Sequence, residues 1–288
     1  METVWLNGTY MPLSEGSVSL EDRALQFADG VYEVIAAYDG VPILLREHLE
    51  RMERSAAGLR MPSPYTFAQR AEVIGELIAR LGSGRAMVYG QLSRGAARRA
   101  HPFPATPQPN EYWYARALPP INTAMYEKGV GLISVPDERW ARCWIKSTCL
   151  LANVLAKQDA VDAGAFDVMM VREDGTVTEA SAANLYAVKD GVIHTHPADG
   201  RILAGCKRSM VLDVARGEGL EVREEKFHET LARSADELFL TSTTINVVPA
   251  TALDGKPVGT GQVGPIARRL NELVGEQIRR AIADGAAA

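Results

Sequence analysis

The spacing of hydrophobic residues changes several times along the first 118 residues. Short apolar stretches lie on either side of Asn7-Gly8 and Asp39-Gly40, and this pattern predicts hairpins. Hydrophobic residues then recur every three or four positions, which is typical of amphipathic helices. Stretches rich in β-branched and aromatic residues follow. The pattern predicts strands at 4–11, 31–38, 86–93 and 111–118, and helices at 45–59 and 67–81.

A second series of strands and helices begins after a segment with two adjacent prolines. The prolines of residues 118–123 restrict the backbone, and periodic structure stops on both sides. We expect a linker there, between a small domain of residues 1–117 and a larger domain of residues 124–288. The elements predicted beyond it are a strand at 130–135, a helix at 151–163, hairpins at 167–180 and 184–195, a helix after Gly205, strands at 220–224 and 237–242, and a last helix from Pro265 to about Ala283.

Hairpins mixed with helices favour two mixed α/β, or α+β, domains over a regular βαβ repeat. A length of 288 residues agrees with two domains of ordinary size. The 31 basic and 36 acidic residues give a net charge of −5, which disfavours nucleic acids and anionic membranes as partners. No apolar run approaches the ~18 residues of a membrane helix. The first residues lack a signal-peptide pattern.

The three cysteines, Cys143, Cys149 and Cys206, form no CxxC pair, and a sparse odd set is typical of a reducing compartment. We therefore expect a soluble cytoplasmic protein.

Lys146 and Glu179 are the first candidates for chemistry. Lys146 lies in an apolar stretch, where desolvation lowers the pKa of an amine and favours the neutral form that Schiff-base chemistry requires. The alternative is a lysine that extends its ammonium group to water past an apolar stem. Glu179 ends a predicted strand and precedes small residues, so it could accept a hydrogen bond from a planar cofactor. It could equally be a solvated charge at a strand end.

Two further patterns suggest anion binding. Arg99 and His101 lie two positions apart in a proline-flanked loop, and in an extended backbone both would face one side and could hold a carboxylate. The alternative is a solvated basic loop. Gly205 precedes a predicted helix, and hydroxyl residues cluster at 241–244. A helix N-terminus and hydroxyl groups can bind a phosphate, although many helices begin this way without a ligand.

Metal and nucleotide chemistry receive little support. His194 and His196 form an HxH pair, but no third ligand type lies nearby in the sequence, so we expect no metal site. The GxGxxG, GxxxxGK[ST], HExxH and GxSxG motifs are absent.

The order of these features along the chain is more informative than each feature alone. The stretches EDRALQFADGVYEV, REHLERM, SRGAARRAHPFP, RWARCWIKSTCLLANVLAKQDA, DGTVTEASAANLYAV, RILAGCKRSMV and ELFLTSTT resemble, in order, the motifs of fold-type IV pyridoxal-phosphate transaminases. Within this family the chain looks most similar to the D-amino-acid transaminases, from about residue 4 to residue 280. The resemblance implies a mixed α/β fold with a small N-terminal α/β domain and a larger C-terminal pseudo-barrel domain.

The resemblance also implies roles for individual residues. Lys146 would form the Schiff base with pyridoxal 5'-phosphate and move the proton, and Glu179 would pair with the pyridine nitrogen. Leu203 would pack on the ring, and Arg139 would lie near its hydroxyl edge. The residues implied to bind the phosphate are Arg51, Cys206, Lys207, Ser242 and Thr243. Those implied to bind the substrate carboxylate are Tyr32, Arg99 and His101, of which the last two would come from the partner subunit of a homodimer.

The expected reaction moves an amino group between D-amino acids (D-alanine, D-glutamate) and 2-oxo acids (2-oxoglutarate, pyruvate), with ping-pong kinetics. Val34 and its neighbours would leave the side-chain pocket permissive. Alternatives with the same fold are a branched-chain L-amino-acid transaminase, an aminodeoxychorismate lyase and an (R)-amine transaminase. A scaffold without activity would require Lys146 to be unreactive. The chain departs from the family at Cys206-Lys207, where an apolar residue and a threonine are usual, and this puts the affinity for the cofactor in doubt.

Overall fold

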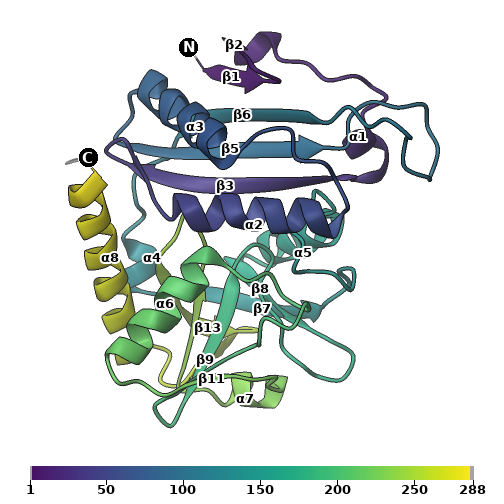
Figure 1. The fold of residues 1–288 in the computed structure, drawn as a ribbon. Coiled ribbons are helices and arrows are strands. Elements are labelled where there is room, and N and C mark those ends of the chain that lie inside the picture. Colours follow the sequence, from purple (N-terminus) through teal and green to yellow (C-terminus); the bar gives the residue numbers. More distant parts are fainter. Residues whose placement is uncertain (1, 286–288) are drawn as a thin grey trace. The chain divides into compact units, whose positions relative to one another are not determined.

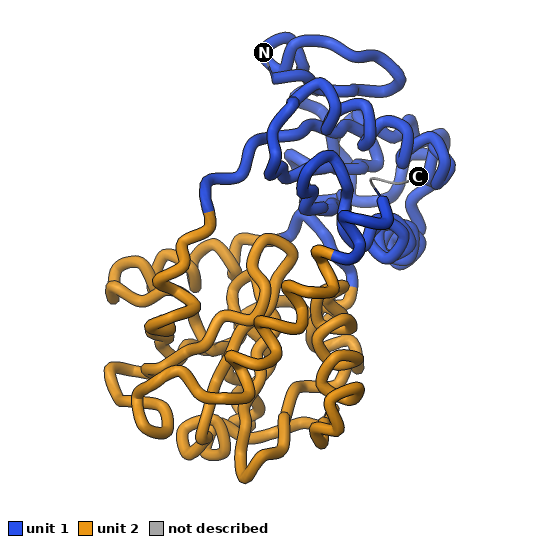
Figure 2. Tube along the Cα trace, turned by 90° about the vertical axis from the view of Figure 1, so that its left-hand side faces the viewer, with its two compact units in different colours: residues 1–120, 145–149, 280–288 blue, residues 121–144, 150–279 orange. Residues whose placement is uncertain are grey.

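A computed structural model of the chain describes residues 2–285 (Figure 1). The chain forms two compact units (Figure 2). Unit 1 consists of Met1–Pro120, Ile145–Cys149 and Arg280–Ala288, and unit 2 of Ile121–Trp144 and Leu150–Arg279. Neither unit is a single continuous stretch of chain. The domains predicted at 1–117 and 124–288, with a linker at 118–123, stay a prediction.

Unit 1 is built on an antiparallel sheet with the strand order β2-β1-β6-β5-β3-β4. Its strands are β1 (Thr3–Leu6), β2 (Thr9–Pro12), β3 (Gly30–Tyr38), β4 (Val41–Pro42), β5 (Arg85–Ser93) and β6 (Asn110–Ala117). Its helices are η1 (Leu13–Glu15), α1 (Arg23–Phe27), α2 (Leu45–Gly58) and α3 (Phe67–Leu81). Figure 1 shows α2 and α3 lying along the long strands of this sheet. Their apolar residues pack with Ile35, Val88 and Trp113 in one core.

The two helices predicted from the 3.6-residue period are confirmed, and local sequence explains where α3 begins and ends. Thr66 and Gln69 form a reciprocal capping box at its N-terminus. Gly82 ends the helix with a positive φ of 62°, which glycine adopts without a steric penalty. The helix α3 also carries Arg70, which is buried and binds both carboxylate oxygens of Glu111 on β6, at 2.6 and 2.7 Å.

Unit 2 contains an eight-stranded mixed sheet with the order β11-β10-β9-β12-β13-β7-β8, and β14 pairs with β13. Three strand pairs are parallel (β7–β8, β7–β13, β10–β11), and the others are antiparallel. The strands are β7 (Val130–Pro136), β8 (Asp167–Val171), β9 (Asn184–Lys189), β10 (Val192–Thr195), β11 (Val222–Glu224), β12 (Glu237–Thr241), β13 (Val247–Leu253) and β14 (Lys256–Pro257). The helices are α4 (Ala124–Glu127), α5 (Leu151–Asp162), α6 (Cys206–Gly217), α7 (Glu229–Arg233) and α8 (Pro265–Gly285). The mixed α/β class is confirmed.

Two predictions for unit 2 differ from the structure. The return strand expected at 176–180 forms only isolated bridges, because its backbone alternates between partners: Val177 donates to the carbonyl of Phe227, and Thr178 to that of Met170. The strand β13 has no counterpart in the sequence-based prediction. It contains Pro249, a residue that argues against a central strand. Within residues 2–285, no helix has the length and apolar character that crossing a membrane requires.

Candidate active site

The Lys146 segment of unit 1 runs beside the start of β3. The Tyr32 amide donates to the carbonyl of Lys146 at 3.0 Å, and the Thr148 amide donates to the carbonyl of Gly30 at 3.0 Å. The amide of Lys146 itself donates to the hydroxyl of Ser55 on α2 at 3.1 Å. Three hydrogen bonds therefore fix the backbone of the lysine segment against a strand and a helix.

The side chain of Lys146 is half-buried, and its Nζ lies 4.2 Å from the centroid of the Tyr32 ring. An ammonium group over an aromatic face is attracted by the negative face of the ring. Among the described residues of unit 1, no carboxylate lies within ion-pair distance of this Nζ. The structure thus brings together two of the predicted site residues, Lys146 and Tyr32, and leaves the amine without a competing carboxylate in its unit.

Arg51 is buried on α2, where it binds a carboxylate of the chain. Its Nε donates to Oε1 of Glu33 at 2.7 Å and its Nη2 to Oε2 at 2.9 Å. His48 Nδ1 lies 2.8 Å from the same Oε2. Burial opposes ionisation of Glu33, but the charge and hydrogen bonds of Arg51, together with His48, lower its pKa to about 2. Arg51, which was predicted to bind the phosphate, therefore already binds an ionised carboxylate of the chain.

Arg99 and His101 both contact one aromatic ring. The guanidinium of Arg99 is 5.0 Å from the centroid of Phe27, and the ring of His101 is 5.6 Å from it. Both side chains are exposed. The structure brings this predicted pair together, whereas Tyr32 contacts neither residue within the described part of unit 1.

Glu179 of unit 2 is buried, which excludes the alternative of a solvated strand-end charge. It accepts hydrogen bonds from the guanidinium of Arg139 and, at 3.2 and 3.3 Å, from the amide of Leu203. Asn184 Nδ2 donates to Oε2 of Glu179 at 3.1 Å. Three predicted site residues, Glu179, Arg139 and Leu203, are therefore neighbours in this unit.

Burial raises the pKa of the Glu179 carboxyl above its ordinary value, although the Arg139 guanidinium acts in the opposite direction. Arg139 has a second carboxylate partner, because its Nε and Nη2 donate to Asp137 at 2.9 Å each. Glu179 is thus a buried acceptor whose negative charge is incompletely compensated. A cationic ring nitrogen would stabilise the ionised form of such a carboxylate.

The start of α6 offers backbone donors. Gly205 is its N-cap residue and forms no side-chain cap. A Cβ atom at Gly205 would lie 2.2 Å from Oδ1 of Asn184, so the close approach of these two residues requires glycine. Backbone amides in the first turn of a helix favour an anion. Cys206 and Lys207 are both buried in this first turn.

Lys207 connects the two segments predicted to bind a phosphate. Its Nζ donates to Oδ1 of Asn246 at 3.4 Å, and Asn246 ends the turn that contains Ser242 and Thr243, which are half-buried. Burial lowers the pKa of Lys207 to about 8, and no charged group contributes to this shift. A buried ammonium group without a counter-charge is costly, and an anion at this place would remove the cost.

Three functional neighbours were missed from the sequence: Glu33, Asp137 and Asn184. Each binds a predicted residue through its side chain. None was singled out as a site residue, although Glu33 and Asn184 lie within two of the family-like stretches. Asn184 has the only usable signal, since it follows Glu179 by five positions and begins the strand that leads away from it.

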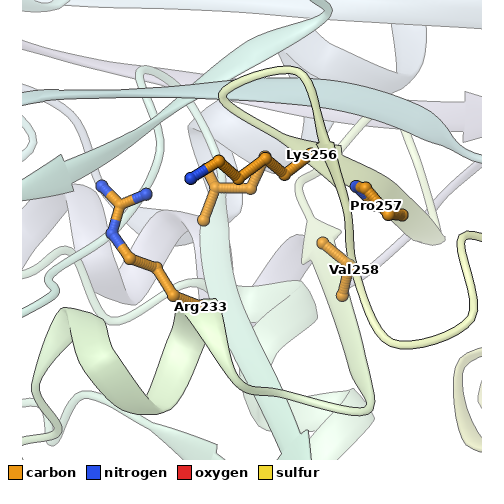
Figure 3. A pocket seen from close by; sticks show the side chains of 5 residues that line it. Arg233, Lys256, Pro257 and Val258 are labelled. Carbon is orange, nitrogen blue, oxygen red and sulfur yellow. The ribbon is translucent and has the colours of Figure 1, made fainter.

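The HxH pair does not gather ligands. His194 Nδ1 lies 3.7 Å from Glu225, and His196 Nδ1 lies 3.7 Å from Asp199. No cluster of three His, Cys, Asp or Glu residues suitable for a metal occurs among residues 2–285. The pocket in Figure 3, lined by Arg233, Leu253, Lys256, Pro257 and Val258, contains none of the predicted site residues.

The residues present fit pyridoxal phosphate in three respects. Lys146 offers an amine without a carboxylate partner in its unit, Glu179 offers a buried acceptor, and Lys207 offers a buried cation beside an uncapped helix N-terminus. These groups match the aldehyde, the ring nitrogen and the phosphate of that cofactor, respectively.

Comparisons with known proteins give a consistent result. The family model of amino-transferase class IV matches residues 30–253. A D-alanine aminotransferase of Staphylococcus epidermidis is 40% identical over 273 residues, which are 94% of this chain and 96% of that protein. A D-alanine aminotransferase of Bacillus licheniformis is 39% identical over 269 residues, 93% and 94% of the two chains. The structure of a branched-chain amino acid aminotransferase from T.th. with pyridoxamine 5'-phosphate is 32% identical, with a TM-score of 0.87 over 95% of this chain and 93% of that one.

Proposed function

Because the chain belongs to the class IV aminotransferases, whose fold-type IV architecture and pyridoxal 5'-phosphate cofactor it shares, we propose that its amino donors are D-amino acids. D-alanine and D-glutamate would exchange their amino group with 2-oxoglutarate and pyruvate. Relatives about 40% identical over nearly their whole length are D-alanine aminotransferases, which supports this substrate class. The observation that carries the proposal is the Arg99–His101 pair on Phe27, since a guanidinium group beside an imidazole can donate hydrogen bonds to a substrate carboxylate.

The catalytic work of the chain rests on Lys146 in this proposal. Pyridoxal phosphate supplies, when bound, a ring that takes up electron density from the substrate Cα. Lys146 would bind the cofactor through its Nζ and, once released by the amino donor, would move the proton at the substrate Cα. The Tyr32 ring lies beside this Nζ and would help to position it. Glu179 would accept a hydrogen bond from the ring nitrogen and would favour its protonated form.

The other residues of unit 2 orient and bind. Arg139 holds Glu179 and would lie near the ring hydroxyl, and Leu203 would pack on the ring while its amide binds Glu179. The phosphate would be bound by the amides of Cys206 and Lys207, the ammonium of Lys207, the hydroxyls of Ser242 and Thr243, and Arg51.

We also propose that the enzyme is a homodimer, and α5 supports this. The helix exposes its large apolar residues, Leu151 (71%), Val154 (59%) and Leu155 (54%), while it buries the small residues Ala156 and Ala160. This is the reverse of an ordinary surface helix, and exposed apolar surface of this kind indicates an interface. A second copy of the chain is the partner that the proposed sharing of Arg99 and His101 between subunits requires.

The sheet of unit 1 offers a second apolar surface. Side chains alternate along a strand, and Glu33 and Glu111 face α2 and α3, so Tyr32 and Tyr112 lie on the opposite face. Tyr89 and Tyr114 stack there with ring centroids 5.4 Å apart.

The homodimer can be tested by light scattering after gel filtration, which should give twice the chain mass for the wild type and the chain mass for a V154E/L155E variant. A monomeric wild type contradicts the proposal.

The decisive experiment is an absorbance spectrum of the purified protein before and after addition of D-alanine, L-alanine or L-leucine. We expect a visible band that D-alanine alone bleaches, because the amino transfer changes the cofactor. Bleaching by L-leucine alone would move the assignment to a branched-chain L-amino-acid transaminase, the class to which the T.th. neighbour belongs. R99A should sharply reduce turnover of D-alanine, whereas turnover that is insensitive to R99A would favour that alternative.

A further inference from the structure

The loop that carries Arg99 and His101 is anchored by a buried pair of arginines that share one carboxylate. Oδ2 of Asp29 accepts from Nε of Arg23 at 2.7 Å and from Nε of Arg94 at 2.8 Å. Oδ1 accepts from Nη2 of Arg94 at 3.0 Å. Burial opposes ionisation of Asp29, but Arg94 and Arg23 together hold its pKa below the ordinary value. The cluster is therefore a set of charge-assisted hydrogen bonds in a largely buried site.

The guanidinium of Arg23 binds three successive carbonyl groups of the loop. Nη1 donates to the carbonyl of Ala100 at 2.6 Å and, more weakly, to that of Pro102 at 3.4 Å. Nη2 donates to the carbonyl of His101 at 3.3 Å. Arg23 is only 3% exposed, whereas residues 99–103 are all exposed. The buried side chain of Arg23 thus fixes an exposed loop at the residues that are predicted to bind the substrate carboxylate.

The side chains of the loop are fixed by the same short helix. Phe27 lies four residues after Arg23 on α1, and the guanidinium of Arg23 packs 4.8 Å from its ring centroid. Arg99 and His101 contact this same ring. Arg94 in turn packs 3.6 Å from the ring centroid of Phe103 and donates to the carbonyls at the end of α2. Asp29 immediately precedes β3, the strand of Tyr32.

We propose that Arg23, held by Asp29, is a positioning residue for the substrate carboxylate: it sets the backbone at 100–102 and so the direction of Arg99 and His101. This rests on the proposed role of Arg99 and His101 in binding the substrate. Arg23 touches no substrate itself and acts through these two residues. The charged fork of arginine is needed, because Nε binds Asp29 while both Nη atoms bind the loop, and lysine has a single nitrogen.

The first test is the steady-state kinetics of R23K with D-alanine and 2-oxoglutarate. We expect KM for both substrates to rise about tenfold or more, with kcat within about twofold of the wild type, because binding is lost equally from ground and transition states. The absorbance of the bound cofactor should be unchanged. R70K is the matched control: Arg70 is equally buried in unit 1 and binds a carboxylate, but it does not touch the loop. It should lose stability without a change in KM.

A double-mutant cycle separates positioning from a general structural role. If Arg23 acts through Arg99 and His101, adding R23K to an R99A/H101A variant should not raise KM further. D29N leaves Arg23 in place and should raise KM in the same way but by a smaller factor. It replaces R23K in the cycle if R23K does not fold. Full additivity of R23K with R99A/H101A, or an unchanged KM in R23K, overturns the proposal.

The failure of the positioning role can be told from the failure of the proposed function. A wild type that does not turn over D-alanine contradicts the proposed function alone. The cycle is then measured with L-leucine, and a reaction insensitive to both R99A and R23K overturns the positioning role as well.

Discussion

Each of the two units buries a glutamate against an arginine, and the pKa values of the two carboxyl groups are shifted in opposite directions. Glu33 of unit 1 has a pKa lowered to about 2, whereas the pKa of Glu179 in unit 2 is raised. Burial opposes ionisation in both cases. The difference lies in the partners: Arg51 binds both oxygens of Glu33, and His48 adds a third contact. Arg139, in contrast, divides its guanidinium between Glu179 and Asp137.

This contrast shows how pairing decides the role of a buried carboxylate. Complete pairing makes the group part of the fold, and incomplete pairing leaves it able to bind a further cation. Glu33 is fully compensated by the protein, so its ionised form contributes to folding. Glu179 keeps a preference for its protonated form until another cation approaches. A perturbed carboxyl of this kind is typical of a functional site.

The largest expected effect is on activity in E179Q. A glutamine amide cannot hold the ring nitrogen protonated, so we expect kcat with D-alanine to fall roughly a thousandfold, equivalent to about 4 kcal/mol. Stability at pH 7 should stay within about 1 kcal/mol of the wild type, because Arg139 keeps Asp137 and is not left unpaired. Single-turnover kinetics and urea unfolding measure the two effects. A large loss of stability in E179Q would mean that Glu179, like Glu33, mainly stabilises the fold, and would contradict the comparison.

The second prediction concerns E33Q. The substitution leaves the buried guanidinium of Arg51 without its carboxylate, and breaking a buried ion pair from one side costs about 3–5 kcal/mol. We expect urea unfolding at pH 7 to show a loss of this size. E76Q is the control, since Glu76 pairs with Arg80 on the exposed surface of α3 and should change stability by less than about 1 kcal/mol.

The third prediction is the pH dependence of that loss. A carboxyl whose pKa falls from 4.5 to about 2 on folding stabilises the native state above pH 4.5, and this contribution disappears as the pH falls toward 2. The difference in unfolding free energy between wild type and E33Q should therefore be about 2 kcal/mol smaller at pH 3 than at pH 7. A difference that does not change with pH would mean that Glu33 is not ionised in the native protein.

The smallest expected effect is on ligand affinity and concerns a buried cation, Lys207, instead of a buried carboxylate. Lys207 has a pKa of about 8 without a ligand, and a bound phosphate should raise it. The affinity for pyridoxamine 5'-phosphate should therefore weaken up to about thirtyfold between pH 7 and 9.5, where the phosphate stays a dianion. K207R should keep its affinity, since guanidinium does not lose its proton. Pyridoxamine without the phosphate is the control. A K207T protein with the same pH dependence as the wild type would exclude Lys207 as the cause.

Much of the fold could be predicted from local pattern. The helices α2, α3, α5 and α6 follow from hydrophobic period and from glycine stops, and the β9–β10 hairpin follows from Asp190-Gly191. The strand β13 could not be predicted, because Pro249 argues against a strand and only pairing with β7 and β12 overrides it. Local sequence carries no information about that pairing.

The candidate site divides in the same way. The order of motifs identified Lys146, Glu179 and the Arg99–His101 pair, and their proposed roles stay predictions. The sequence did not show which groups these residues bind, because the fold and not the motif brings the groups together. Arg23 reaches the carbonyl of an alanine 77 positions away, and Arg139 binds a glutamate 40 positions away. A motif records which residues recur together, whereas these contacts depend on the tertiary fold.

The discontinuity of unit 1 has a consequence for synthesis on the ribosome. Residues 145–149 belong to this unit, and their backbone forms hydrogen bonds with Tyr32 and Gly30 at the start of β3. During elongation, all six strands of the sheet leave the ribosome before the lysine segment does. The start of β3 therefore gains these hydrogen bonds only after all strands of the sheet have been synthesised. A chain released after residue 120 lacks both Lys146 and the hydrogen bonds of its segment to β3.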